Sequence, residues 1–148
     1  ENTRQFLAAA QAIAPEETLI SGYRSRAEQE ELYNEKVAGE VAKGLSNEEA
    51  VSIVLKQVQL PGASEHQTGL AIDMSVPEGQ EDELAAKIAE LAPQYGFVLR
   101  YPDGKSDITG VDFENWHYRY VGVENAQYMQ KHNLVLEEYI ALLKAAGK

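Results

Sequence analysis

The 148-residue chain contains no cysteine and no long run of apolar residues. Without cysteine it can form no disulfide and offers no thiolate ligand, so any metal ion must be bound by histidine and carboxylate side chains. Without a long apolar run it has no candidate membrane span, although 44% of its residues are hydrophobic. Its length suits one folding unit, so we expect a single domain over residues 1–148.

Positive charge is also scarce, because 13 Lys and Arg residues stand against 24 Asp and Glu residues. The formal charge of -11 argues against nucleic acid and anionic membrane surfaces as partners. Calcium binding has little support, because no run of alternating Asp and Asn resembles a calcium loop. The chain starts at Glu1 rather than Met, and we expect an anchoring segment that is missing from this chain.

Hydrophobic periodicity, caps and turn residues predict a mixture of helices and strands. The expected helices cover residues 4–14, the segments after Ser25 and after the capping box Ser46–Glu49, residues 80–95, and two segments of residues 123–148 that separate near Asn133. The expected strands cover residues 18–23, 70–76, 97–101 and 116–121. The mixture predicts an α+β fold in which an antiparallel sheet carries the functional site and helices pack around it.

Two segments hold the residue types of a zinc hydrolase: SEHQTGLAID at residues 64–73 and ENWHYRYVG at residues 114–122. A catalytic zinc ion typically has three nitrogen or oxygen ligands from the protein and keeps a fourth position for water. One further carboxylate, Glu114, remains to act as a base. The candidate ligands are His66, Asp73 and His117.

The spacing between His66 and Asp73 excludes one continuous helix, because their Cα atoms would lie roughly 10 Å apart along its axis. The chain must therefore turn between them, and Gly69 is a permissive place for the turn. In the strand that follows, Ile72 and Met74 share one face, while Asp73 points to the opposite face and toward a cleft.

The second segment needs a bend. A strand period of two places His117 and Arg119 on one face. Glu114 lies an odd number of positions before His117, so it reaches the same side only if the chain departs from a regular strand. We expect that bend near Asn115 or Trp116.

These motifs resemble a known family. The pattern S-x-H-x-x-G-x-A-x-D, followed by E-x-W-H, is similar to that of the VanY-type zinc D-Ala carboxypeptidases of bacterial cell walls. SGYRSRAEQ at residues 21–29 and GFVLRYPDGK at residues 96–105 also match that family. The segments 61–75 and 92–105 are most similar to the LdcB/DacB group of L,D-carboxypeptidases.

The resemblance implies a zinc cofactor (Zn2+) and hydrolysis of the last peptide bond of peptidoglycan stem peptides. Glu114 would take a proton from the attacking water, and Arg24 would stabilise the developing oxyanion. Gln29 would contact the substrate. Other candidate substrate contacts, some of which could read the terminal carboxylate, are Ser64, Tyr101, Trp116, Arg119 and the loop around Arg100. His132 lies in no such pattern, and we expect it to be a surface histidine.

The similarity to the LdcB/DacB group favours an L,D-carboxypeptidase that removes D-Ala from tetrapeptide stems. One alternative is a D,D-carboxypeptidase or D,D-dipeptidase acting on pentapeptide stems or D-Ala-D-Ala. Another is a non-catalytic wall-binding module with a structural zinc, but such a site has no need of Glu114 beside an open coordination position. We expect a monomer outside the bacterial cytoplasm, at the cell surface or wall, with no membrane contact by the domain itself.

Overall fold

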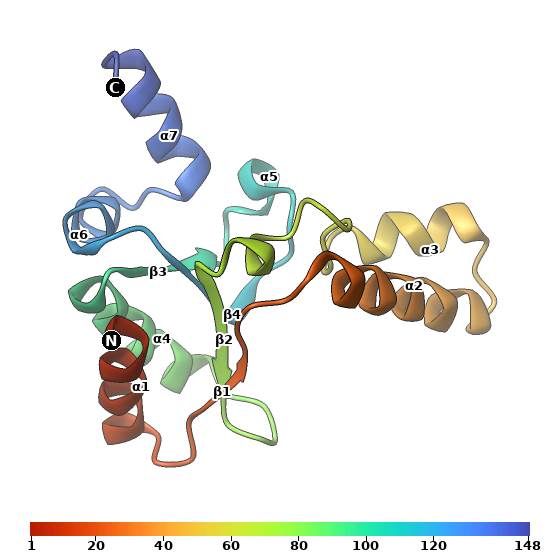
Figure 1. The fold of residues 1–148 in the computed structure, drawn as a ribbon, viewed down its shortest axis with the longest axis horizontal. Helices are drawn as coiled ribbons and strands as arrows, with labels where there is room; N and C mark the ends of the chain where they lie inside the picture. Colours follow the sequence, from red (N-terminus) through yellow and green to blue (C-terminus); the bar gives the residue numbers. More distant parts are fainter.

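Four strands are interspersed among the helices in the computed structural model, which describes residues 1–148 (Figure 1). The α-helices are α1 (Asn2–Ile13), α2 (Arg26–Ala42), α3 (Asn47–Val54), α4 (Asp82–Leu91), α5 (Ser106–Thr109), α6 (Val123–Lys131) and α7 (Leu136–Ala145). The strands and 3-10 helices are β1 (Thr18–Ser21), β2 (Ala71–Ser75), β3 (Phe97–Tyr101), β4 (Glu114–Tyr120), η1 (Glu65–Thr68) and η2 (Ala92–Tyr95). The predicted α+β class is confirmed, and none of the helices has the length and apolar character needed to cross a membrane.

The four strands form one antiparallel sheet in the order β1-β2-β4-β3. The two central strands, β2 and β4, pair so that Asp73 lies opposite His117 and Ile72 lies opposite Tyr118. Directly opposed residues of an antiparallel pair project to the same face. The register therefore places two candidate metal ligands side by side on one face and two apolar side chains on the other.

The apolar face of the sheet is covered by α1, α4 and η2. Phe6 of α1 stacks on Phe97 at 5.3 Å between ring centroids and meets Tyr118 edge-on at 5.0 Å. Burial of each such side chain contributes about 1.5–3 kcal/mol. The buried members of this core are Phe6, Ala10, Ala14, Ile72, Met74, Ile88, Ala92, Phe97 and Tyr118. The opposite face of β2 and β4 is left for the polar site.

Helices α2 and α3 form a hairpin that projects to one side of the sheet (Figure 1). Each begins at a serine whose hydroxyl accepts a hydrogen bond from the backbone N–H three residues later, while the glutamate there binds the serine's own N–H. These two capping boxes, Ser25–Glu28 and Ser46–Glu49, confirm both predicted starts.

Other boundaries differ from the prediction. The helix expected over residues 80–95 is α4 followed by the 3-10 helix η2, because Pro93 has no N–H to continue the α-helical ladder. Gly96 ends η2 with φ 86°, and a Cβ there would lie 2.6 Å from the ring of Tyr120. Helix α1 begins at Asn2 rather than Arg4, and α5 was not predicted. Asn133, with φ 51°, separates α6 from α7 as expected.

Candidate active site and metal centre

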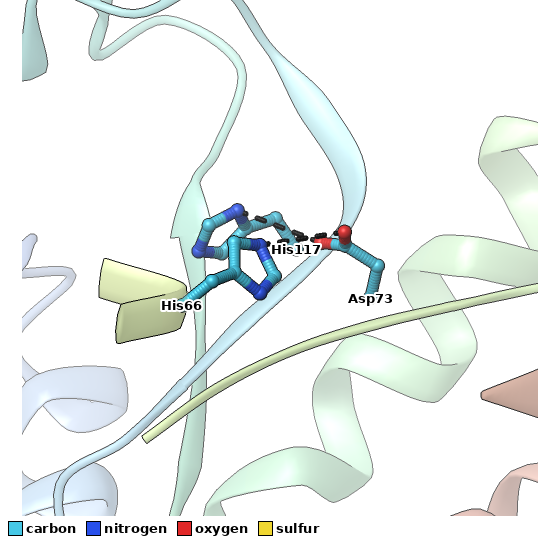
Figure 2. A group of neighbouring side chains, drawn as sticks. All are labelled: His66, Asp73 and His117. Carbon is cyan, nitrogen blue, oxygen red and sulfur yellow. Dashed lines mark ion pairs between the residues drawn. The ribbon is translucent and has the colours of Figure 1, made fainter. Parts of the chain in front are cut away.

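His66, Asp73 and His117 come together on the polar face of the sheet, with their candidate ligand atoms within 4.8 Å of one another (Figure 2). All three residues are buried. Gly69 ends η1 in the left-handed conformation, with φ 74°, so the chain turns between the ligand on η1 and the ligand on β2. The turn predicted from the spacing is confirmed at the expected glycine.

Each histidine uses one ring nitrogen to hold its orientation. His66 Nδ1 lies 2.8 Å from the carbonyl oxygen of Gly22, which leaves Nε2 facing Asp73 Oδ2 at 3.4 Å. His117 is arranged the other way round, with Nε2 3.3 Å from Glu65 Oε2 and Nδ1 3.6 Å from Asp73 Oδ1. A ring nitrogen that donates to an oxygen leaves the other nitrogen unprotonated in a neutral imidazole. The two free nitrogens therefore converge on Asp73.

The carboxylate between them has an unsatisfied oxygen. Asp73 Oδ1 is buried and has no hydrogen-bond partner. A buried carboxylate oxygen in that condition is costly unless it meets a donor or a cation. Two imidazole nitrogens and one carboxylate oxygen are a typical donor set for catalytic zinc. The residues present thus fit a divalent metal ion, with room for a fourth ligand.

Glu114 reaches the same site through an irregularity in β4. Leu99 of β3 lies opposite Tyr118, but Tyr101 lies opposite Glu114, so two steps along β3 correspond to four along β4. This bulge is the bend predicted near Asn115 or Trp116. It brings Glu114 Oε2 to 3.3 Å from His117 Nδ1.

The electrostatics of the site favour positive charge. Burial alone would lower the pKa of His117, but hydrogen bonds to Glu114 and Glu65 and the charge of Asp73 raise that pKa to about 9. Burial would likewise raise the pKa of Glu65, but its contacts with His117 and Arg100 outweigh this effect and lower that pKa to about 2. The surrounding carboxylates therefore stabilise positive charge at the His117 ring, and Glu65 stays ionised beside it.

A cleft of about 410 Å³ opens over the three ligands and Glu114. It lies between the sheet, helix α2, residues 57–59 after α3, and the segment before β4. The predicted catalytic and substrate residues that line it are Arg24, Gln29, Ser64, Tyr101 and Trp116. The structure thus brings these five side chains to one cavity with the metal ligands.

Arg24 is held at the cleft by its neighbours. Its guanidinium donates from Nη1 to Gln29 Oε1 at 2.8 Å and from Nη2 to Ser21 Oγ at 3.0 Å. Its backbone N–H donates to the carbonyl oxygen of His66 at 3.1 Å. Gln29 is 1% exposed, and its amide nitrogen donates to the carbonyl oxygen of Gln59 at 2.6 Å. With both ends of its amide occupied, Gln29 is placed to orient Arg24.

The remaining three lining residues differ in exposure. The hydroxyl of Ser64 is buried and accepts a hydrogen bond from the N–H of His66 at 3.3 Å, which caps η1. The ring of Tyr101 packs edge-on against His117 at 5.0 Å between centroids, and burial raises the pKa of its phenol. Trp116 is 41% exposed, so it forms part of the rim.

Two predicted cationic contacts lie outside the cleft lining. Arg119 Nη1 is 3.0 Å from Glu65 Oε1, and Arg100 Nε is 2.6 Å from the same oxygen. Arg100 also donates both terminal nitrogens to Glu137, at 2.9 and 2.6 Å. These cations are engaged by carboxylates behind the metal ligands, and a role for Arg119 or the loop around Arg100 in substrate binding stays a prediction. His132 is exposed, as expected of a surface histidine.

Glu65 is the site residue that the sequence analysis missed. It stands directly before a predicted ligand, and its side chain contacts the other predicted histidine. A signal was present, because metal-binding histidines generally donate their second ring nitrogen to a carboxylate or a carbonyl oxygen. That rule calls for an acidic residue near His117 in space, but spacing alone does not reveal which one.

The fold and the site together define a metal-dependent hydrolase arrangement: three nitrogen and oxygen ligands, a carboxylate beside them, and a cleft above. The family model of VanY, D-alanyl-D-alanine carboxypeptidase, matches residues 1–123. The chain belongs to this family.

Known relatives agree with this assignment. A D-alanyl-D-alanine carboxypeptidase of Enterococcus faecalis (strain ATCC 700802 / V583) is 42% identical over 124 residues, which are 82% of this chain and 46% of the relative. The chain therefore spans about half the length of that relative.

Solved structures include both specificities of the family. VanYB in complex with D-Alanine-D-Alanine has a TM-score of 0.88 at 39% identity, covering 95% of this chain and 78% of the other. A VanY D,D-pentapeptidase variant in complex with Zn(II) has a TM-score of 0.84 at 38% identity, covering 94% of this chain and 79% of the other. The LD-carboxypeptidase LdcB has a TM-score of 0.76 at 33% identity, covering 95% of this chain and 65% of the other.

Proposed function

We propose that this chain is a zinc-dependent carboxypeptidase domain that removes the C-terminal D-Ala from peptidoglycan stem peptides. The observation that carries the proposal is the convergence of His66, Asp73 and His117 beside Glu114 at the base of one cleft. The VanY enzyme solved with Zn(II) and the one solved with D-Alanine-D-Alanine support the choice of metal and of ligand class. Peptidoglycan as substrate implies action outside the cytoplasm. We also expect the protein to be a monomer.

The chemistry follows from the positions of the side chains. Zinc bound by the three ligands would polarise the peptide carbonyl and lower the pKa of water toward about 7. Glu114 accepts the proton of the attacking water and returns it to the amine of the departing D-Ala. The guanidinium of Arg24, held at the cleft by Gln29 and Ser21, would stabilise negative charge that develops on the carbonyl oxygen. Tyr101 and Trp116 form walls of the cleft.

Within this activity we favour the L,D specificity, in which a tetrapeptide stem becomes a tripeptide. The similarity of residues 61–75 and 92–105 to the LdcB/DacB group supports it, and the likeness to VanYB supports the D,D alternative. An L,D-enzyme must hold a long diamino side chain beside the scissile carbonyl, where a D,D-enzyme meets only a methyl group. In an L,D-enzyme, the polar groups that bind the long side chain stay unpaired when the smaller substrate is bound. Each unpaired buried group weakens binding by about 1–3 kcal/mol.

Mass spectrometry of defined muropeptides incubated with the zinc-loaded protein tests both levels of the proposal. We expect release of D-Ala, with catalytic efficiency on tetrapeptide at least roughly tenfold higher than on pentapeptide, a difference of about 1.4 kcal/mol. Accumulation of uncut tetrapeptide from pentapeptide would establish the D,D alternative instead. No cleavage of either stem by zinc-loaded protein would favour a wall-binding module with a structural zinc.

A further inference from the structure

Glu65 occupies the centre of a largely buried polar cluster directly behind the metal ligands. Its Oε2 lies 3.3 Å from His117 Nε2. Its Oε1 is shared by Arg100 Nε at 2.6 Å and Arg119 Nη1 at 3.0 Å. Both oxygens are therefore engaged, one by a candidate metal ligand and the other by two guanidinium groups.

This arrangement fixes the orientation of His117. The carboxylate accepts a hydrogen bond from Nε2, so Nδ1 offers its lone pair on the side of Asp73 once the ring is neutral, the form in which it binds a metal ion. The two arginines hold the carboxylate from behind and oppose its rotation away from the ring. The His117 ring also packs edge-on against the ring of Tyr101, which limits its movement toward that side.

The cluster continues to the C-terminal helix. Arg100 donates Nη1 to Glu137 Oε2 at 2.9 Å and Nη2 to Glu137 Oε1 at 2.6 Å, a bidentate pair of the geometrically specific kind. Glu137 lies in the first turn of α7, and α7 lies beyond residues 1–123, which the family model covers. An unbroken series of contacts thus runs from α7 through Arg100 and Glu65 to His117.

We propose that Glu65 is a positioning residue for the metal site and that Glu137 of α7 holds it in place through Arg100. The C-terminal helix then contributes to metal affinity although none of its residues touches the metal position. This inference rests on the metal site of the proposed function, but it concerns metal binding and not the choice of substrate.

The next residue of α7 provides a matched control. Glu138 pairs with Lys105 at 3.0 Å, and its Oε2 also accepts the N–H of Val135 at 2.9 Å. Like Glu137–Arg100, this pair joins a glutamate of α7 to a cation, but Lys105 Nζ contacts only Glu138 and does not bind Glu65. Glu138→Gln retains an acceptor for the N–H of Val135 and removes the charge facing Lys105, just as Glu137→Gln removes the charge facing Arg100.

The experiment compares the dissociation constant for zinc in Glu65→Gln, Glu137→Gln and Glu138→Gln by competition with a chelator, without substrate. Loss of an outer partner of a metal ligand generally weakens metal binding about 10- to 100-fold, which we expect for Glu65→Gln. We expect a weakening of roughly threefold or more for Glu137→Gln and less than about twofold for Glu138→Gln. The visible absorption of the cobalt-substituted protein should shift in Glu65→Gln, because the His117 ring is no longer fixed.

Thermal unfolding of the metal-free variants separates positioning from folding. Glu137→Gln and Glu138→Gln each lose one partly exposed ion pair and should unfold at similar temperatures. Unchanged zinc affinity in Glu65→Gln would overturn the positioning role, and equal zinc affinity in Glu137→Gln and Glu138→Gln would overturn the link to α7. If Glu65→Gln fails to fold, Glu65→Asp, which keeps the charge on a shorter side chain, replaces it with the same expected direction. Tight zinc binding without cleavage of muropeptides would refute the proposed function and leave this inference standing.

Discussion

The two faces of the central sheet are built from alternating residues of the same strands, yet they are stabilised differently. On the core face, Met74 and Tyr118 lie among apolar side chains supplied by α1, α4 and η2. On the site face, their chain neighbours Asp73 and His117 meet charged groups, and Asp73 Oδ1 has no partner. The core face is stabilised by the packing of apolar side chains, whereas the polar groups of the site face need a bound cation to be satisfied. Changes on the site face should therefore alter metal binding and turnover more than folding, and changes on the core face the reverse.

The sharpest test of the site face is Glu114→Gln, which keeps the shape of the side chain but cannot accept a proton at neutral pH. We expect the variant to retain zinc and to lose roughly two to four orders of magnitude in turnover, the usual contribution of a general base. The measurement is kcat on tetrapeptide together with metal content. Glu90→Gln, at an exposed position on α4, is the control and should behave as the parent. Near-normal turnover in Glu114→Gln would move the base elsewhere.

Replacing one residue on each face should separate the two kinds of stabilisation. His66→Ala or His117→Ala removes one of three ligands, and we expect zinc content to fall from about one ion per chain to background. Phe6→Ala leaves all ligands in place but creates a cavity in the core. We expect this cavity to lower the unfolding free energy by about 3–5 kcal/mol. Metal analysis and urea denaturation of the metal-free proteins measure the two effects. Full zinc occupancy in both histidine variants would refute the ligand assignment.

The sequence predicted what depends on local spacing. The strands, the alternation that places Asp73 and His117 opposite the core, the turn at Gly69 and the capping box at Ser46 all agree with the structure. The bend that brings Glu114 to His117 also followed from the odd spacing between them.

The sequence did not predict the partners of the site from distant segments. Glu65 meets His117 across 52 positions, and Arg100 meets Glu65 across 35 and Glu137 across 37. These pairings depend on how helices and loops pack around the sheet, which no local period encodes. For that reason the sequence did not reveal that Arg119 and Arg100 both bind the carboxylate of Glu65.

Arg24→Lys tests whether the cleft needs a directed donor or only a positive charge. Lysine keeps the charge but cannot bind Gln29 Oε1 and Ser21 Oγ with the fixed fork of a guanidinium. We expect kcat to fall by about tenfold or more while KM changes much less, because the contact is made to charge that develops during the reaction. Arg26→Lys, two residues along on the exposed start of α2, is the control. A change confined to KM would assign Arg24 to substrate binding.

The smallest expected effect concerns Glu17, a buried carboxylate beside the core face. Glu17 is 1% exposed, its Oε2 accepts a hydrogen bond from Gln80, and its Oε1 has no partner. Burial raises the pKa of Glu17, partly opposed by that hydrogen bond, so the folded protein holds this proton more tightly than the unfolded chain does. Its contribution to stability is complete below the unfolded pKa of about 4.3 and is lost as the pH rises through the raised folded pKa.

Glu17→Gln removes this titration and keeps a side chain of the same shape. We therefore expect the unfolding free energy of the variant to fall less than that of the parent between about pH 4 and pH 8, by about 1 kcal/mol, the scale for one unsatisfied buried polar group. Urea denaturation of the metal-free proteins across that range measures the difference. Zinc affinity should be unchanged, because Glu17 is not a ligand and makes no contact with Glu65, Arg100 or Arg119. Parallel pH profiles for the variant and the parent would show that Glu17 is already ionised in the folded protein, and that the core face tolerates its charge.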